Sequence, residues 1–104
     1  MDKIPASIEK SVRRFITEVG QWRRIKEAYL YGSQAKGMAS KWSDIDIAVI
    51  SSEFSNDLFE ERVALMHIAA RIDDRIEPYP FLETTFTSNN PLRDEIQKYG
   101  VRIV

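Results

Sequence analysis

The run Ile-Asp-Ile-Ala-Val-Ile at positions 45–50 constrains the fold more than any other part of this 104-residue chain. Its β-branched and mostly apolar residues predict a strand. The run also contains a carboxylate, and an uncompensated buried carboxylate costs several kcal/mol. Asp46 therefore needs a compensating group, and a purely structural explanation of it is poor.

The residues before this run predict a helix, a strand and a glycine turn. Apolar residues recur at helical spacing between Pro5 and Gly20. The short aromatic run 28–31 predicts a strand that ends at Gly32. Residues 33–38 are long enough for only one or two helical turns.

The residues after the run continue the alternation of helices and strands. We expect a second helix from about Asp57 to Arg71, with Asn56 or Asp57 as its cap. Its apolar face is expected to contain Phe59, Val63, Met66 and Ala70, widened by Leu65, Ile68 and Ile72.

The C-terminal part predicts two further strands and a third helix. A strand starts at Arg75, and two prolines in it indicate an edge strand or a strand that ends there. After a polar loop at 84–90, Asn90 caps a helix that has Pro91 at its first position. Leu92, Ile96 and Tyr99 form the apolar stripe of this helix, which ends at Gly100. Residues 101–104 predict the last strand.

This alternation predicts an α/β or α+β domain, with helices packed on a central sheet. We expect a single domain over residues 1–104, because a second core would have too little apolar surface to bury. The formal net charge of −1 disfavours a grip on long nucleic acids. The chain contains no cysteine and no apolar run of membrane-spanning length, so we expect a cytoplasmic protein.

Three acidic residues are candidates for a metal site. Asp44 and Asp46 are two positions apart, so on a strand their side chains share one face and their charges repel. A hard cation such as Mg²⁺ removes that repulsion and binds carboxylate oxygens together with water and phosphates. With Glu77 on a third strand, the acids could hold two metals for an in-line displacement.

A glycine turn supplies the second half of the candidate site. A strand that ends in Gly32-Ser33 and enters a helical turn presents backbone N–H groups and a hydroxyl to a phosphate. Lys36 could add positive charge for a triphosphate, and Gly37 lets the chain turn away. Ser43 opens the acidic run and joins the nucleotide-binding candidates.

Simpler interpretations remain open for several of these residues. Asp44 could be a turn cap and Glu77 a surface residue. Trp22 and Trp42 could stack on a base, although packing over the edge of the core is the commoner use of such side chains. His67 lies on the polar side of the second helix, so we assign it no role.

The stretch from Leu30 to Val49, LYGSQAKGMASKWSDIDIAV, resembles the signature of the minimal nucleotidyltransferases of the DNA polymerase beta superfamily. That signature is Gly-Ser, a short spacer, and Ser-Asp-x-Asp followed by apolar residues. The resemblance implies a nucleotidyltransferase fold with a central mixed sheet of about four strands. This chain has Gln34, and at position 36 a lysine, where family members commonly have arginine, and its third acid is glutamate rather than the frequent aspartate.

The resemblance also implies a reaction. An acceptor hydroxyl attacks the α-phosphate of a nucleoside triphosphate such as ATP, and pyrophosphate leaves. Ser33 would contact the phosphates, whereas Asp44 and Asp46 would bind Mg²⁺ and Glu77 would act as the third acid. Positioning and metal electrostatics suffice for such chemistry, so no dedicated nucleophile is needed.

Stand-alone proteins that resemble this one are often antitoxins paired with a helical HEPN-domain ribonuclease. Our leading hypothesis is transfer of AMP to a tyrosine hydroxyl of such a partner. One alternative is an antitoxin that neutralises its partner by binding alone. Another is transfer of AMP to a small molecule of the aminoglycoside type.

Overall fold

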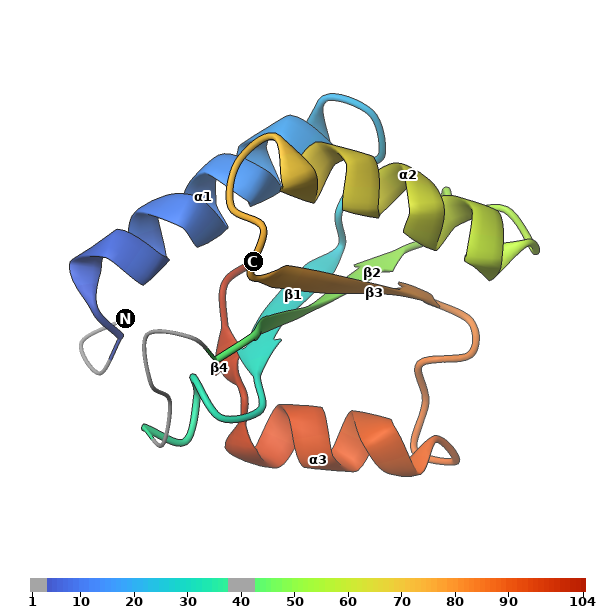
Figure 1. Cartoon of the computed structure of the whole chain (residues 1–104). Coiled ribbons are helices and arrows are strands. Elements are labelled where there is room, and N and C mark those ends of the chain that lie inside the picture. The colour runs from blue at the N-terminus through green and yellow to red at the C-terminus, as the bar shows by residue number, and fades with distance from the viewer. Residues whose placement is uncertain (1–3, 38–42) are drawn as a thin grey trace.

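A mixed four-stranded sheet lies between two layers of helices (Figure 1). The computed structural model describes residues 4–37 and 43–104. The described residues form, in chain order, α1 (Ala6–Gly20), β1 (Glu27–Tyr31), β2 (Ile45–Ser51), α2 (Leu58–Ala70), β3 (Ile76–Leu82), α3 (Pro91–Tyr99) and β4 (Val101–Arg102). Helices α1 and α2 lie side by side over one face of the sheet, and α3 covers the other. The expected α+β architecture with about four strands is confirmed.

Strand β2 occupies the centre of the sheet, whose order is β3-β2-β1-β4. It pairs antiparallel with β1 and parallel with β3, and β1 pairs antiparallel with β4. Every residue of β2 is buried except Asp46, which is half-buried. A strand with a neighbour on each side and helices over both faces needs a nearly continuous apolar sequence, which residues 45–50 provide.

Strand β3 forms one edge of the sheet and runs past both of its prolines to Leu82. The register with β2 is regular from Ile45↔Ile76 onward, because a proline nitrogen that faces away from β2 leaves the ladder intact. Arg62 Nε donates to the carbonyl oxygen of Pro78 at 3.1 Å, so that carbonyl faces the open side. Of the two sequence interpretations, the edge strand is confirmed.

Two apolar clusters hold the layers together. The larger lies between the sheet and the α1–α2 layer, and Phe15, Leu30 and Leu65 are among its fully buried members. The smaller lies between the sheet and α3, around Ile50 and Ile96. Trp22 packs against the larger cluster with its ring centroid 6.3 Å from that of Phe54, which is the commoner use expected for it.

Helix α2 corrects one sequence prediction. Its buried face contains Glu61, Leu65 and Ala69. The residues that widen the predicted apolar face, Leu65, Ile68 and Ile72, turn toward the core, whereas the main line of that face points to solvent. Phe59 is 76% exposed and Met66 is 42% exposed. Helix α2 is apolar on more than one side, so periodicity could not select the inner face. The exposed line of this helix consists of Phe59, Val63, Met66 and Ala70.

Burial of an acid on the inner face of α2 is possible because the acid is fully paired. Arg23 Nη2 lies 3.0 Å from Glu61 Oε1, and the backbone N–H of Ser55 donates to the same oxygen at 2.7 Å. A paired and hydrogen-bonded carboxylate avoids most of the cost of desolvation. The helix therefore places its acidic position inward and part of its apolar surface outward.

The helix caps agree with the sequence patterns. Asp57 accepts a hydrogen bond from the backbone N–H of Glu60, and Asn90 accepts one from that of Leu92. In α3 only Ile96 is fully buried, so the expected three-residue stripe reduces to one core residue. The last strand spans Val101–Arg102 rather than 101–104, although Ile103 N still donates to Ala28 O. Across the two described ranges, no helix has the length and apolarity needed to cross a membrane.

Candidate active site

Gly32 ends β1 in a conformation that suits glycine. Its φ is +72°, in the left-handed region that L side chains rarely adopt. A Cβ atom at this position would also overlap the Oδ2 oxygen of Asp46. The turn therefore lies directly against the carboxylate, as expected if phosphate and metal sites are adjacent.

The sheet register aligns Asp46 with Glu77. Asp46 pairs with Tyr31 on β1 and with Glu77 on β3, so the three residues form a row across three strands. Their neighbours two positions along the strands include Tyr29 and Ala48, which pack in the cluster beside α3. The row therefore lies on the α3 face, at the end of the sheet where β1 finishes and β2 and β3 begin.

The other member of the acidic pair, Asp44, lies two residues before Asp46 and one residue before β2 starts. It is exposed, whereas Asp46 and Glu77 are half-buried. Burial raises the pKa of Asp46, and the charges of Asp44 and then Glu77 raise it further. The structure thus brings the three predicted carboxylates into electrostatic contact, with Asp46 at the centre.

Two tyrosines line the row and respond to the same charge. Burial and then the charge of Asp46 raise the pKa values of Tyr31 and Tyr79 above their ordinary value. The two rings lie 6.0 Å apart between centroids. Both phenols therefore stay protonated near neutral pH and provide hydrogen-bond donors beside an anionic centre.

The three carboxylates Asp44, Asp46 and Glu77, the acid row from here on, fit a hard divalent cation. They do not form a preassembled metal cage. Among the described residues, no group of three His, Cys, Asp or Glu side chains converges as a metal site. Within the same residues Asp44 and Asp46 form no ion pair, so their repulsion is unrelieved. Mg²⁺ commonly uses one or two carboxylates and completes its shell with water and substrate phosphates. Asp44 and Asp46 suit that mode of binding.

Glu77 differs because it already has a cationic partner. Arg62 reaches from α2 around the edge of β3 and places Nη2 3.4 Å from Glu77 Oε2. The same guanidinium lies 4.6 Å from the centroid of the Tyr79 ring and is anchored on the Pro78 carbonyl. Sequence reasoning missed Arg62, because nothing in a helical pattern shows that a side chain reaches a strand edge.

The candidate phosphate-binding residues are placed less uniformly. Ser33 follows Gly32 in the turn and is half-buried. The Lys36 ammonium is 3.7 Å from Glu95 Oε1, and 5.4 Å from the Tyr99 ring centroid, so it lies against α3. Ser43 is half-buried beside Asp44. The candidate Trp42 lies outside the described residues.

Gln34 is a further residue that sequence reasoning treated only as a departure from the family. It is buried, with 5% exposure, and its Nε2 donates to the carbonyl of Ser43 at 3.5 Å. This contact joins the glycine turn to the start of the acidic run. A neutral amide therefore braces the two halves of the site.

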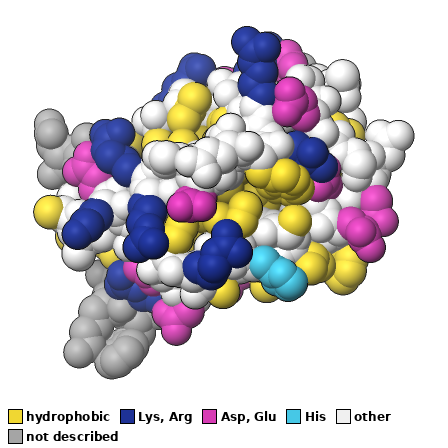
Figure 2. Space-filling model, turned by 90° about the horizontal axis from the view of Figure 1, so that it is seen from above, with side chains coloured by type: hydrophobic (Ala, Val, Ile, Leu, Met, Phe, Trp, Pro, Cys, Tyr) yellow, Lys and Arg dark blue, Asp and Glu magenta, His cyan; other side chains and the backbone are white. Residues whose placement is uncertain are grey.

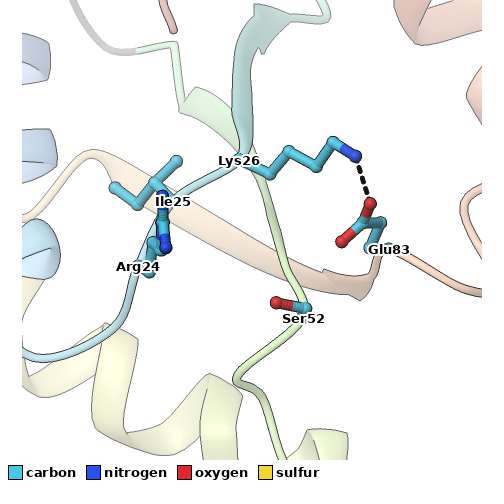
Figure 3. Close-up of a pocket in the computed structure, with 5 residues that line it drawn as sticks. All are labelled: Arg24, Ile25, Lys26, Ser52 and Glu83. Carbon is cyan, nitrogen blue, oxygen red and sulfur yellow. Dashed lines mark hydrogen bonds and ion pairs between the residues drawn. The ribbon is translucent and has the colours of Figure 1, made fainter.

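A polar hollow of about 430 Å³ lies at the opposite end of the sheet (Figure 3). Arg24, Ile25 and Lys26 precede β1, whereas Ser52 and Glu83 follow β2 and β3. Lys26 and Glu83 form an ion pair beside it. The acid row lies at the other end of these strands, so the hollow is separate from the candidate active site.

The fold is shared with a solved structure. A crystal structure of a protein from Sulfolobus solfataricus, described as a nucleotidyltransferase, superposes with a TM-score of 0.58. The two sequences are 23% identical, and the match covers 94% of this chain and 86% of that one. This likeness shows the fold. No curated protein matches the chain.

The sequence profile of one family covers most of the chain and the entire acid row. The profile, described as polymerase beta, nucleotidyltransferase, matches residues 15–104. The match includes the glycine turn, the acidic pair and the third acid on β3. With the row of carboxylates beside a glycine turn on a mixed sheet, the chain belongs to the polymerase beta nucleotidyltransferase family, whose chemistry is nucleotidyl transfer.

Proposed function

We propose that this protein is a Mg²⁺-dependent adenylyltransferase that moves AMP from ATP to a hydroxyl, the tyrosine hydroxyl of a HEPN-domain partner, and so acts as an antitoxin. The observation that carries the proposal is the row of Asp46 and Glu77 beside Gly32, with Asp44 at its open end. The resemblance of residues 30–49 to minimal nucleotidyltransferases supports the choice of acceptor.

Each candidate residue has a separate role in the proposed reaction. Asp44 and Asp46 hold Mg²⁺, which supplies charge neutralisation for the triphosphate and the leaving pyrophosphate. The backbone of the Gly32-Ser33 turn and the Ser33 hydroxyl bind phosphate oxygens. Ser43 completes the nucleotide contacts, and Lys36 joins it once its ammonium leaves the ion pair with Glu95 on α3.

The transfer itself needs one bond made and one broken. The acceptor oxygen bonds to the α-phosphorus of ATP as the bond between that phosphorus and the β-bridging oxygen breaks. Glu77 accepts the hydroxyl proton, and the β- and γ-phosphates leave together as pyrophosphate. Asp44 is exposed, so a hydroxyl on the surface of another protein can approach this end of the sheet from solvent.

Label transfer tests this proposal. The protein, the product of the neighbouring gene, Mg²⁺ and ATP labelled at the α-phosphate are incubated together, and label on the partner is measured. We expect label with the wild type and with Glu53→Gln, an exposed acid that follows β2 at the opposite end of the sheet, and none with Asp46→Asn. An unlabelled partner, or equal labelling with Asp46→Asn, would contradict the proposal.

A second candidate is neutralisation of the partner by binding alone. It is favoured by the pairing of Glu77 with Arg62 and by the position of Lys36 against α3, since neither cation points to an open phosphate site. In this case Asp44→Ala and Asp46→Ala still protect cells that express the partner. Loss of protection with both variants, while each still copurifies with the partner, would exclude it.

A further inference from the structure

The exposed apolar stripe of α2 is a feature that the active site does not use. Phe59, Val63 and Met66 are 76%, 38% and 42% exposed, and Ala70 extends their line. The spacing of four, three and four residues gives one continuous seam over the length of the helix. Figure 2 shows hydrophobic side chains beside the single histidine at the border of the α1–α2 surface.

The opposite face of the same helix is already buried. Leu65 and Ala69 lie in the core with 0% and 2% exposure. A helix that is apolar on two sides is normally covered on both, and contiguous exposed apolar surface marks an interaction site. The stripe therefore lacks a cover of its own chain within the described residues.

Charges beside the stripe identify the cover. Glu60, His67 and Arg71 lie along one flank at positions that face the same way on a helix, and all three are exposed. The acid is at the N-terminal end and the two basic residues are at the C-terminal end. Within the described residues neither Glu60 nor Arg71 forms an ion pair.

An antiparallel arrangement of two such helices matches this pattern. In an antiparallel pair related by a two-fold axis, each flank meets the same flank of the other copy. Glu60 of one copy then faces His67 and Arg71 of the other, and this happens twice. A parallel pair would instead set this flank against the opposite flank of the other helix, so Glu60 would not meet Arg71.

We propose that the α2 stripe is the seam of a homodimer, in which two copies pack α2 against α2 in antiparallel fashion. Helix α2 covers the face of the sheet opposite α3, and the acid row lies on the α3 face. Dimerisation therefore leaves both acid rows accessible. The proposal stands whether or not the adenylyltransferase function is correct.

Sedimentation velocity over a wide range of concentration tests the seam. We expect the wild type to dimerise in the micromolar range, which suits a small interface. Phe59→Gln and Met66→Gln should each weaken the dimer at least about tenfold. Leu92→Gln alters an exposed leucine on α3 and should leave dimerisation unchanged, which controls for loss of apolar surface in general.

A charge exchange distinguishes a second copy from any other partner. Glu60→Arg and Arg71→Glu should each raise the dissociation constant about tenfold, because each sets like charges together. The double variant restores both pairs and should return to within about threefold of the wild type. Circular dichroism confirms that each variant is folded, and Met66→Gln serves if one is not. A wild type that stays monomeric, or binds only a different protein, would overturn the proposal, as would a double variant that is not restored.

Discussion

The ionised form of Asp46, which metal binding would require, is the form that the folded protein disfavours. Burial and two neighbouring carboxylates oppose its ionisation, so its pKa is raised. A group with a raised pKa in the folded state contributes stability only while it is protonated, and that contribution is lost as the pH rises through the folded pKa. At neutral pH the ionised Asp46 therefore weakens the metal-free fold.

We predict that Asp46→Asn abolishes nucleotidyl transfer and raises the free energy of unfolding at neutral pH by about 1 kcal/mol. The advantage of the variant should shrink as the pH falls toward the ordinary aspartate pKa of 3.8, where the wild type is protonated. Urea denaturation across this pH range measures it. Added Mg²⁺ should stabilise the wild type more than the variant, and equal stabilisation would argue against a metal at Asp46.

Gly32 is expected to tolerate no side chain, and Gly37 offers a matched control. Both have φ near +70°, but a Cβ at Gly32 would overlap Asp46, whereas one at Gly37 has open space. Gly37→Ala should cost about 1–2 kcal/mol from the backbone alone. We predict that Gly32→Ala costs more than this and removes activity. Thermal unfolding and label transfer on both variants separate backbone strain from the clash.

Arg62 pairs with Glu77 at 3.4 Å and would compete with any cation that binds this carboxylate. We predict that Arg62→Gln tightens Mn²⁺ binding about threefold or more, because removing a positive charge strengthens the field at the acid row. Isothermal titration with Mn²⁺ measures this without any need for turnover. Arg13→Gln, which breaks an exposed pair with Glu9 on α1, is the control and should have no effect.

At the scale of elements, Asp73 joins α1 to the connection between α2 and β3. Its carboxylate accepts hydrogen bonds from Ser11 Oγ at 2.9 Å and from Arg75 Nη2 at 2.7 Å. The hydrogen bond from the Arg75 side chain, opposed by burial and reinforced by Ser11, lowers the pKa of Asp73 to about 2. Here the ionised form stabilises the fold, in contrast to Asp46.

We predict that Asp73→Asn lowers the free energy of unfolding by about 2 kcal/mol at neutral pH. A lowered pKa contributes stability that is present above the ordinary pKa and lost as the pH falls through the folded one. The gap between wild type and variant should therefore close between about pH 4 and pH 2. A gap that persists below pH 2 in urea denaturation would show that the charge is not responsible.

The elements themselves could be predicted from sequence wherever local chemistry determines them. Asp57 and Asn90 cap helices through contacts within a few residues, and the residues of β2 are apolar for the whole strand. The inner face of α2 could not be predicted, because both sides of the helix are apolar and the choice depends on Glu61 meeting Arg23, 38 positions away in the chain. Pairing of this kind is invisible to periodicity.

At the scale of the whole molecule, the candidate active site lies at one end of the sheet. The acid row could be predicted because Asp44 and Asp46 are two positions apart and so share one side of an extended segment, and the register then aligns Glu77 with Asp46. Arg62 and Gln34 could not, since each reaches the site only after the chain has folded. The polar hollow lies at the other end of the sheet, and the α2 stripe lies on the opposite face, so neither overlaps the acid row.

The prolines of β3 limit how this protein can aggregate. An unpaired strand edge is a template on which another chain can add by backbone hydrogen bonding, and proteins prevent such growth with prolines and charged side chains. Pro78 and Pro80 remove donors from the open edge, and Arg62 occupies the carbonyl of Pro78. Sheet extension into fibrils is thereby blocked on this side. A chain that contacts this edge finds few backbone partners there, so side chains must supply much of the contact.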